Sequence, residues 1–268
     1  MHRLSINHYS IRQWDLNELV DGCRKAGITN VGLWRDKVSP LGLDTARRLV
    51  EKADVTVSSL CRGGFFPYSS DQDRIKGMDD NQRAVDEAKA LGSPLLVLVC
   101  GGIASAGLER SREMVFEGIA ALTPYAQARG IKLGIEPLHP MFTANRSVIS
   151  SLEQANDLAN QFPADTVGVV VDTYHVWWDP HVYREIERAG SRIVAFHVSD
   201  WLALPPDFLN GRGVMGDGCI DFAKLVAAIN RAGYQGAIEV EIFNDQLWAL
   251  PGDTALALIK TRFSEFIK

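Results

Sequence analysis

Residues 167–180 read VGVVVDTYHVWWDP, and this stretch decides the fold. Its first part is an almost unbroken run of valines that ends on Asp172. A strand that is apolar on both faces is typical of a parallel sheet covered by helices on each side. A buried aspartate is costly unless it is paired, hydrogen-bonded or bound to a metal. We therefore expect a buried parallel strand over 167–171 that delivers a functional carboxylate at its C-terminal end.

The same alternation of helix and buried strand recurs along the chain. Apolar residues at helical spacing predict the helices, for which Asp15, Asp44 and Asp221 are candidate N-caps. Glycines separate several of these helices from the strand that follows. Short apolar runs predict strands over 4–7, 30–34, 55–60, 95–99, 131–135, 167–171, 193–196 and 237–240.

Eight strands alternating with helices predict an α/β chain with parallel pairing through right-handed crossovers. The matching architecture is a (β/α)8 TIM barrel, which usually has roughly 250 residues and carries its active site at the C-terminal strand ends. We expect one domain over residues 1–268. An open doubly wound sheet is the rival architecture, but no GxGxxG follows the first strand, and the polar strand ends are spread over four consecutive units.

Charge, cysteine usage and hydropathy exclude several classes of protein. The formal net charge of −5 offers no diffuse attraction for a phosphate backbone, which argues against a nucleic-acid partner. The four cysteines never form a CxxC, so neither a structural zinc site nor a disulfide framework is indicated. The longest apolar run, 95–100, is too short to span a bilayer, and no targeting segment precedes it. These features predict a cytoplasmic protein without a membrane partner.

Four polar side chains occupy the ends of strands five to eight: Glu136, Asp172, His197 and Glu241. In a closed barrel these ends share one rim, where three bare carboxylates would repel one another and a divalent cation would keep them ionised. Oxygen ligands with one imidazole predict one Mn²⁺ or Mg²⁺ ion, with Co²⁺ or Zn²⁺ as alternatives. Glu239 is a rival for the last ligand on the same strand face, but Glu241 is nearer the strand end.

Several segments resemble the metal-ligand strands of the sugar phosphate isomerase/epimerase family, the xylose-isomerase-like barrels that include D-tagatose and D-psicose 3-epimerases and inosose dehydratases. They are GIEPLHP (134–140), VDTYHVWWDP (171–180), AFHVSDW (195–201) and YQGAIEVEIF (234–243). The resemblance implies that the four rim side chains bind one metal and that Glu136 and Glu241 also act as the acid and base. It further implies that His175 and Arg212 contact substrate, and that the chain forms a homodimer or homotetramer.

Two further residues at the rim are predicted to contact substrate: Arg62, at the end of the third strand, and His139. The sequence departs from the epimerases in two places. They have a further carboxylate shortly after the first ligand, where this chain has His139, Met141 and Phe142. The stretch between His197 and Arg212 is also longer here. These departures bear on which sugar is the substrate.

The predicted chemistry is proton transfer next to a ketone. A metal that binds the ketone oxygen and a neighbouring hydroxyl acidifies the adjacent C–H, and a glutamate can remove that proton to give an enediolate. Returning the proton gives an epimerase or isomerase of carbohydrate metabolism, which is the preferred prediction. Expulsion of a β-substituent gives a lyase or dehydratase. Phosphodiester cleavage, as in the endonuclease IV branch, fits less well because that branch uses more histidines, and a non-catalytic binding module is the last alternative.

Overall fold

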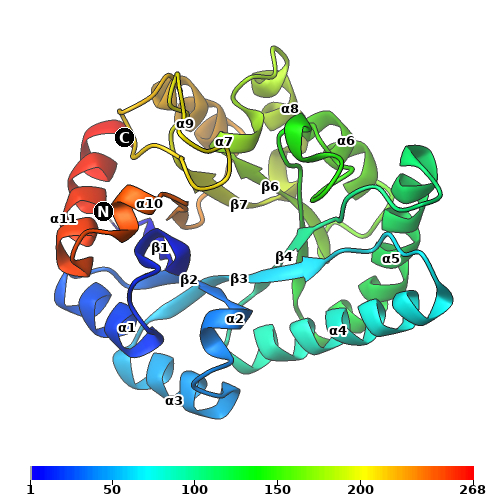
Figure 1. Ribbon diagram of the computed structural model, residues 1–268, viewed down its shortest axis with the longest axis horizontal. Coiled ribbons are helices and arrows are strands. Elements are labelled where there is room, and N and C mark those ends of the chain that lie inside the picture. The colour runs from blue at the N-terminus through cyan, green and yellow to red at the C-terminus, as the bar shows by residue number, and fades with distance from the viewer. Residues whose placement is uncertain (1) are drawn as a thin grey trace.

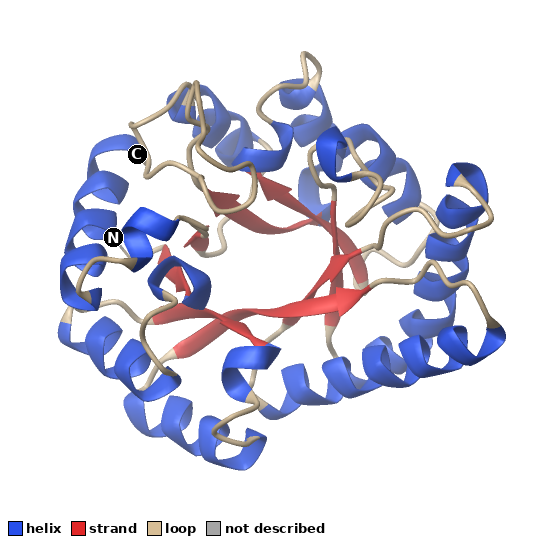
Figure 2. Ribbon diagram, viewed as in Figure 1, coloured by secondary structure: helices blue, strands red, loops and turns tan. Residues whose placement is uncertain are grey.

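The computed structural model describes residues 2–268, and its eight strands close into a parallel barrel inside a ring of helices (Figures 1 and 2). Each strand pairs with its neighbours in sequence, and β8 pairs with β1. The predicted TIM barrel is therefore confirmed. The strands are β1 (Leu4–Asn7), β2 (Asn30–Trp34), β3 (Thr56–Gly64), β4 (Leu95–Val99), β5 (Lys132–Glu136), β6 (Val167–Asp172), β7 (Ile193–Val198) and β8 (Ile238–Val240).

Longer helices cover the outside of the barrel (Figure 2). They are α1 (Leu16–Lys25), α3 (Leu43–Ala53), α4 (Asp71–Ala90), α5 (Leu108–Arg129), α6 (Leu152–Ala159), α8 (Val182–Ala189), α9 (Phe222–Arg231) and α11 (Gly252–Phe266). Short helical segments are α2 (Arg35–Val38), α7 (Thr173–Val176), α10 (Asp245–Trp248) and the 3-10 turns η1 (His8–Ile11), η2 (Pro140–Phe142) and η3 (Gly190–Arg192). Within residues 2–268, every helix is too short or too polar to cross a lipid bilayer.

The predicted helix starts are confirmed at two of three aspartates. Asp15 and Asp221 accept hydrogen bonds from the backbone N–H groups of the first turns of α1 and α9. The prediction for Asp44 is wrong, because α3 already begins after Gly42, whose positive φ of 80° sets the turn. Asp44 lies inside the first helical turn, where its charge still faces the positive end of the helix dipole.

Strand alternation decides which side chains enter the barrel. On β6, Val169 and Val171 belong to the large core between the sheet and the helices, whereas Val170 belongs to a small apolar cluster with residues of β3, β4 and β7. Because side chains alternate along a strand, Asp172 lies on the same face as Val170. Ala195 of β7 belongs to the same small cluster, so His197 also faces inward. The valine run therefore supports the helices and directs its terminal carboxylate to the barrel axis.

Candidate active site

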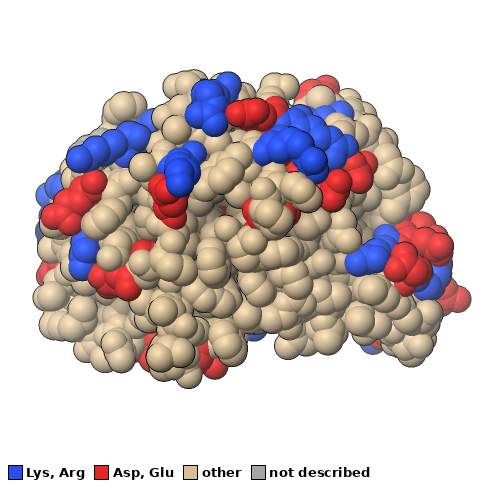
Figure 3. Space-filling model, turned by 90° about the horizontal axis from the view of Figure 1, so that it is seen from above, with Lys and Arg blue, Asp and Glu red and all other residues tan. Residues whose placement is uncertain are grey.

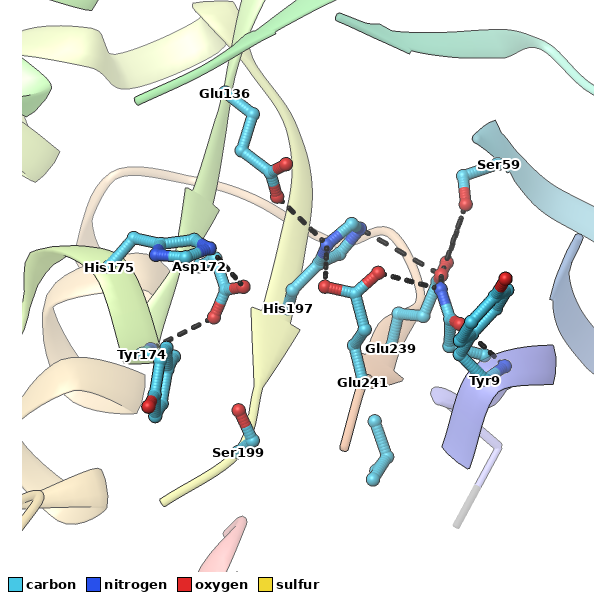
Figure 4. Close-up of polar contacts among 12 residues, drawn as sticks. Tyr9, Ser59, Glu136, Asp172, Tyr174, His175, His197, Ser199, Glu239 and Glu241 are labelled. Atoms are coloured by element: carbon cyan, nitrogen blue, oxygen red, sulfur yellow. Dashed lines mark hydrogen bonds and ion pairs between the residues drawn. The ribbon is translucent and has the colours of Figure 1, made fainter. Parts of the chain in front are cut away.

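The structure brings Glu136, Asp172, His197 and Glu241 together at the C-terminal ends of β5 to β8 (Figure 4). One ligand atom from each residue lies within 4.8 Å of the others, and all four side chains are buried. Asp172 and His197 are direct cross-strand partners, and Glu241 follows β8 at once. The group therefore has the size and donor chemistry of a site for one divalent cation.

The orientation of His197 tests whether these residues fit a metal. Its Nδ1 lies 3.4 Å from Glu136 Oε1 and 3.7 Å from Glu241 Oε2. Within the described residues, neither Nδ1 nor Glu136 Oε1 has a hydrogen bond of good geometry, although both atoms are fully buried. Buried polar atoms without partners are costly, and a cation among them would satisfy all three side chains. The donor set therefore fits a metal ion.

Glu239 lies on the other side of the same imidazole, so it does not join the cluster (Figure 4). Its Oε1 is 3.9 Å from His197 Nε2, and its carboxylate accepts hydrogen bonds from Asn7 at 2.7 Å, Ser58 at 2.8 Å and Ser59 at 2.9 Å. At this distance Glu239 makes no hydrogen bond to Nε2, but its negative charge acts directly on the imidazole. Glu239 is thus a candidate to orient His197 from outside the cluster, which leaves Glu241 as the candidate ligand from this strand.

We predict that Gly32→Ala weakens metal binding without unfolding the barrel. A Cβ at position 32 would lie 1.9 Å from Glu239 Oε1, so the carboxylate would have to leave its hydrogen bonds. Loss of an outer-shell partner typically lowers metal affinity about 10- to 100-fold. Mn²⁺ titration calorimetry measures the change, and circular dichroism checks the fold. Gly77→Ala, where an added Cβ meets nothing within 4 Å, is the control. Equal Mn²⁺ affinity in wild type and Gly32→Ala would contradict the orienting role of Glu239.

Arg212 reaches the cluster from the long segment between β7 and α9. The side chain is buried, and one of its terminal nitrogens lies 3.0 Å from Asp172 Oδ2 and 3.2 Å from Glu241 Oε2. Its guanidinium lies over the rings of Tyr174 and Phe243, 4.6 and 4.8 Å from their centroids. Arg212 therefore holds two of the cluster carboxylates and also faces the pocket beside them.

His175 is a neutral side chain at the edge of the pocket. Burial lowers its pKa to about 3, and its Nδ1 accepts a hydrogen bond from the backbone N–H of His139 at 3.2 Å. The Nε2 atom lies 3.3 Å from a terminal nitrogen of Arg212 and 3.7 Å from Asp172 Oδ2. The ring of His139 instead stacks on Trp201, 5.0 Å between centroids, and does not line the pocket. The structure thus places His175 and Arg212 at the cluster and His139 behind His175.

The two glutamates of the cluster differ in proton affinity. Burial raises the pKa of Glu136 to about 7, and the charge of Glu241 adds to this rise. Burial also raises the pKa of Glu241, but the contacts with His197 and the charge of Arg212 outweigh it, so the net direction is downward. Burial lowers the pKa of His197, while the surrounding carboxylates, Glu239 first, raise it well above its usual value. Without a cation, burial therefore favours the protonated form of Glu136, and the surrounding carboxylates favour the protonated form of His197.

We predict that metal affinity rises with pH across neutrality. Below a pH of about 7 Glu136 is protonated, and His197 carries its proton through a wider range, so a cation must displace protons to bind. Each displaced proton weakens apparent affinity about tenfold per pH unit below the pKa of its group. Mn²⁺ titrations at pH 6, 7 and 8, in buffers of different ionisation enthalpy, measure the slope and the protons released. Affinity that is constant across this range would contradict the assigned ligands.

Sequence reasoning missed several residues of this region. Asn7 ends β1 and donates to both Glu239 and Glu241, so the rule that polar strand ends line the rim would have found it. Trp34, by contrast, is a candidate from the sequence, because a tryptophan at a strand end can stack on a sugar. Its indole N–H donates to Asn7, and the side chain lines the pocket. Arg146 also lines the pocket, but it comes from an irregular loop and no periodic signal marks it.

The fold and the side-chain cluster together define a TIM barrel with a candidate metal centre at the C-terminal strand ends. The chain belongs to the xylose isomerase-like TIM barrel family, whose model matches residues 20–262. The resemblance inferred from the four strand motifs is thereby confirmed.

Relatives of known activity match part of the chain. A 3-dehydroshikimate dehydratase of Pseudomonas putida is 30% identical over 188 residues, covering 67% of this chain and 28% of that enzyme. An inosose isomerase of Bacillus subtilis is 26% identical over 156 residues, covering 57% of this chain and 54% of that enzyme. The chain thus spans about half the length of these relatives or less. They are enzymes, which supports an enzyme here without fixing its type.

Solved structures match over the full length. A protein of Sinorhizobium meliloti 1021 is 46% identical, with a TM-score of 0.97, and the match covers 99% of this chain and 98% of that one. The IOLI protein, whose crystal structure holds a zinc atom, is 20% identical with a TM-score of 0.88, again over 99% and 98% of the two chains. The second match shows the fold alone.

Proposed function

We propose that this protein is a divalent-metal-dependent isomerase or epimerase that acts on a keto-sugar or related polyol ketone through an enediolate. One observation carries the proposal: Glu136 at the end of β5 and Glu241 after β8 both approach His197 Nδ1 and line the same pocket. Two glutamates of different proton affinity beside one pocket are the arrangement that proton removal and return require.

Glu136, Asp172, His197 and Glu241 would hold the cation, and Mn²⁺ or Mg²⁺ suits this oxygen-rich set, with Co²⁺ or Zn²⁺ as alternatives. A bound divalent cation would supply electrostatic stabilisation of the oxyanion that develops at the ketone. The crystal structure of the IOLI protein, which has the same fold, holds a zinc atom, and this supports a metal-binding protein here.

The side chains around the cation would bind substrate and move the proton. One glutamate takes the proton from the carbon next to the ketone, and the other returns a proton from the opposite face or to the adjoining carbon. Arg212 and His175 bind substrate oxygens at the edge of the pocket. Arg62 binds the more distant part of the substrate in the cavity beside it. The backbone N–H of His139 donates a hydrogen bond to His175 Nδ1 and so holds the ring of His175 in position.

A metal-dependent lyase is the second candidate, because a dehydratase is among the relatives at 30% identity. The same enediolate would expel a β-hydroxyl from an inosose or a 3-oxo-sugar. A nucleic-acid substrate is not proposed. On the face shown in Figure 3, acidic side chains lie beside the basic ones and no continuous basic surface forms.

A panel of keto-sugars, inososes and 3-oxo-glycosides, incubated with the Mn²⁺-loaded protein, tests the proposal. An isomerase or epimerase conserves the mass of its substrate and changes its NMR spectrum, whereas a lyase releases water or a leaving group and makes an enone. We expect a product of conserved mass. An enone as the product would establish the lyase instead, and no turnover in any member of the panel or in its phosphorylated and carboxylate counterparts would contradict both.

A further inference from the structure

A cavity of about 500 Å³ adjoins the candidate metal centre. It lies along β3 and α4, and Trp34 and Cys61 line both this cavity and the narrow pocket that contains Glu136 and Glu241. The two spaces are therefore neighbours at the indole and the thiol, and a molecule that binds in both would have to reach from one into the other. The side chains that line the cavity determine which chemical group the far part of that molecule can carry.

Two arginines line these neighbouring spaces, and in the part of the chain that the structure describes neither is in an ion pair. Arg62 of β3 lines the cavity, and Arg146 lines the narrow pocket from the loop after β5. Both are partly buried, and within residues 2–268 neither side chain has a hydrogen bond or an ion pair. Arg62 instead lies over the ring of Phe65, 4.0 Å from its centroid. Burial lowers the pKa of Arg62, and the positive charge of Arg146 lowers it further, although the charge of Asp36 opposes this.

The other two arginines of the pockets are already paired with carboxylates. Arg35 pairs with Asp80 at 2.9 Å and Glu87 at 2.6 Å, and Arg212 pairs with the cluster carboxylates. Asp36 accepts a hydrogen bond from a tyrosine hydroxyl at 2.7 Å and lies beyond ion-pair distance of Arg62. A divalent cation at the metal centre would add further positive charge nearby. Partly buried cations without partners are costly, which makes this space a receptor for an anion.

We propose that the substrate carries an oxyanion, a phosphate or a carboxylate, which Arg62 and Arg146 bind while the ketone lies at the metal centre. Guanidinium groups recognise such oxygens through paired, charge-assisted hydrogen bonds. This inference rests on the proposed function for the position of the ketone. The anion site itself rests on the two arginines and the cavity.

Binding of small oxyanions to the Mn²⁺-loaded full chain tests the site without requiring turnover. Methyl phosphate and acetate are titrated separately by calorimetry, which distinguishes a phosphate site from a carboxylate site. We expect saturable binding of one of them that weakens at least tenfold in Arg62→Leu and in Arg146→Leu, and that persists in Arg184→Leu, a change at an exposed arginine of α8. Binding that is equal in wild type and both variants, as for an anion held by the metal alone, would overturn the inference, and so would no binding.

Matched substrates separate this inference from the proposed function. Deuterium incorporation is compared for D-ribulose and D-ribulose 5-phosphate, and for D-fructose, D-fructose 6-phosphate and D-fructuronate. We expect exchange to favour an anionic member, and Arg62→Leu and Arg146→Leu to remove that preference. Exchange that favours the neutral sugars, unchanged in both variants, overturns the anion site and leaves the proposed function standing. Arginine-dependent oxyanion binding without exchange in any ketose supports the site and refutes the proposed function.

Discussion

Glu136→Gln and Glu241→Gln are each expected to abolish exchange of substrate hydrogen with deuterated water. A glutamine side chain keeps the shape of the glutamate but cannot take up or release the proton. General acid or base catalysis contributes roughly 10²- to 10⁴-fold, so a loss of about 10³-fold is expected for each variant. The measurement is the rate of deuterium incorporation into a ketose, followed by NMR with saturating Mn²⁺.

The control for this experiment must separate proton transfer from metal binding, because both glutamates are proposed ligands. Metal content is therefore measured in each variant, and exchange is compared at equal occupancy. Glu185→Gln is the matched variant, since Glu185 is a buried glutamate on α8 that pairs with Arg188 away from the pocket. It should exchange like wild type. Unchanged exchange in both Glu136→Gln and Glu241→Gln would remove the proposed proton carriers.

Asp172→Ala and His197→Ala are expected to lose the metal and, with it, the activity. Neither residue is a proposed proton carrier, so both act through the cation alone. Loss of an outer-shell partner already lowers affinity about 10- to 100-fold, and loss of a direct ligand is expected to exceed that. Chelation should inactivate wild type, and readded Mn²⁺ should restore it but leave both variants inactive at micromolar metal.

The thermal unfolding temperature of each variant is also measured, because removing Asp172 or His197 leaves other buried charges without a partner and can destabilise the fold. Variants that remain folded and inactive satisfy the prediction. Wild-type activity that survives exhaustive chelation, or variants that retain full activity without bound metal, would end the metal proposal.

The barrel was predictable because its signals are local. Apolar runs such as 167–171 predict a buried strand, and the polar residue that follows the run marks the C-terminal end of that strand. Strand alternation then places Asp172 and His197 on the inner face, so the convergence of the cluster follows from topology. The different positions of Glu239 and Glu241 relative to the cluster could not be predicted from the local sequence. It depends on Asn7 and the serines of β3, which lie more than 170 positions away in sequence.

The residues around the cluster were harder to predict, because loops place them. The position of Arg212 between two aromatic rings depends on how the segment after β7 folds back, which no period in its sequence encodes. Arg146 lies in the loop after β5, which a single β-bridge between Gly101 and Ser147 joins to the segment after β4. His139 was expected at the rim from its distance to Glu136 alone, but stacking on Trp201 turns its ring away.

The claim on which the rest depends is that four successive strands deliver their final polar side chains to one ion. The most direct measurement is an anomalous difference map from crystals grown with Mn²⁺, recorded at the manganese absorption edge. We predict a single strong peak within bonding distance of Glu136, Asp172, His197 Nδ1 and Glu241. A peak elsewhere on the chain, or none at saturating Mn²⁺, would contradict it.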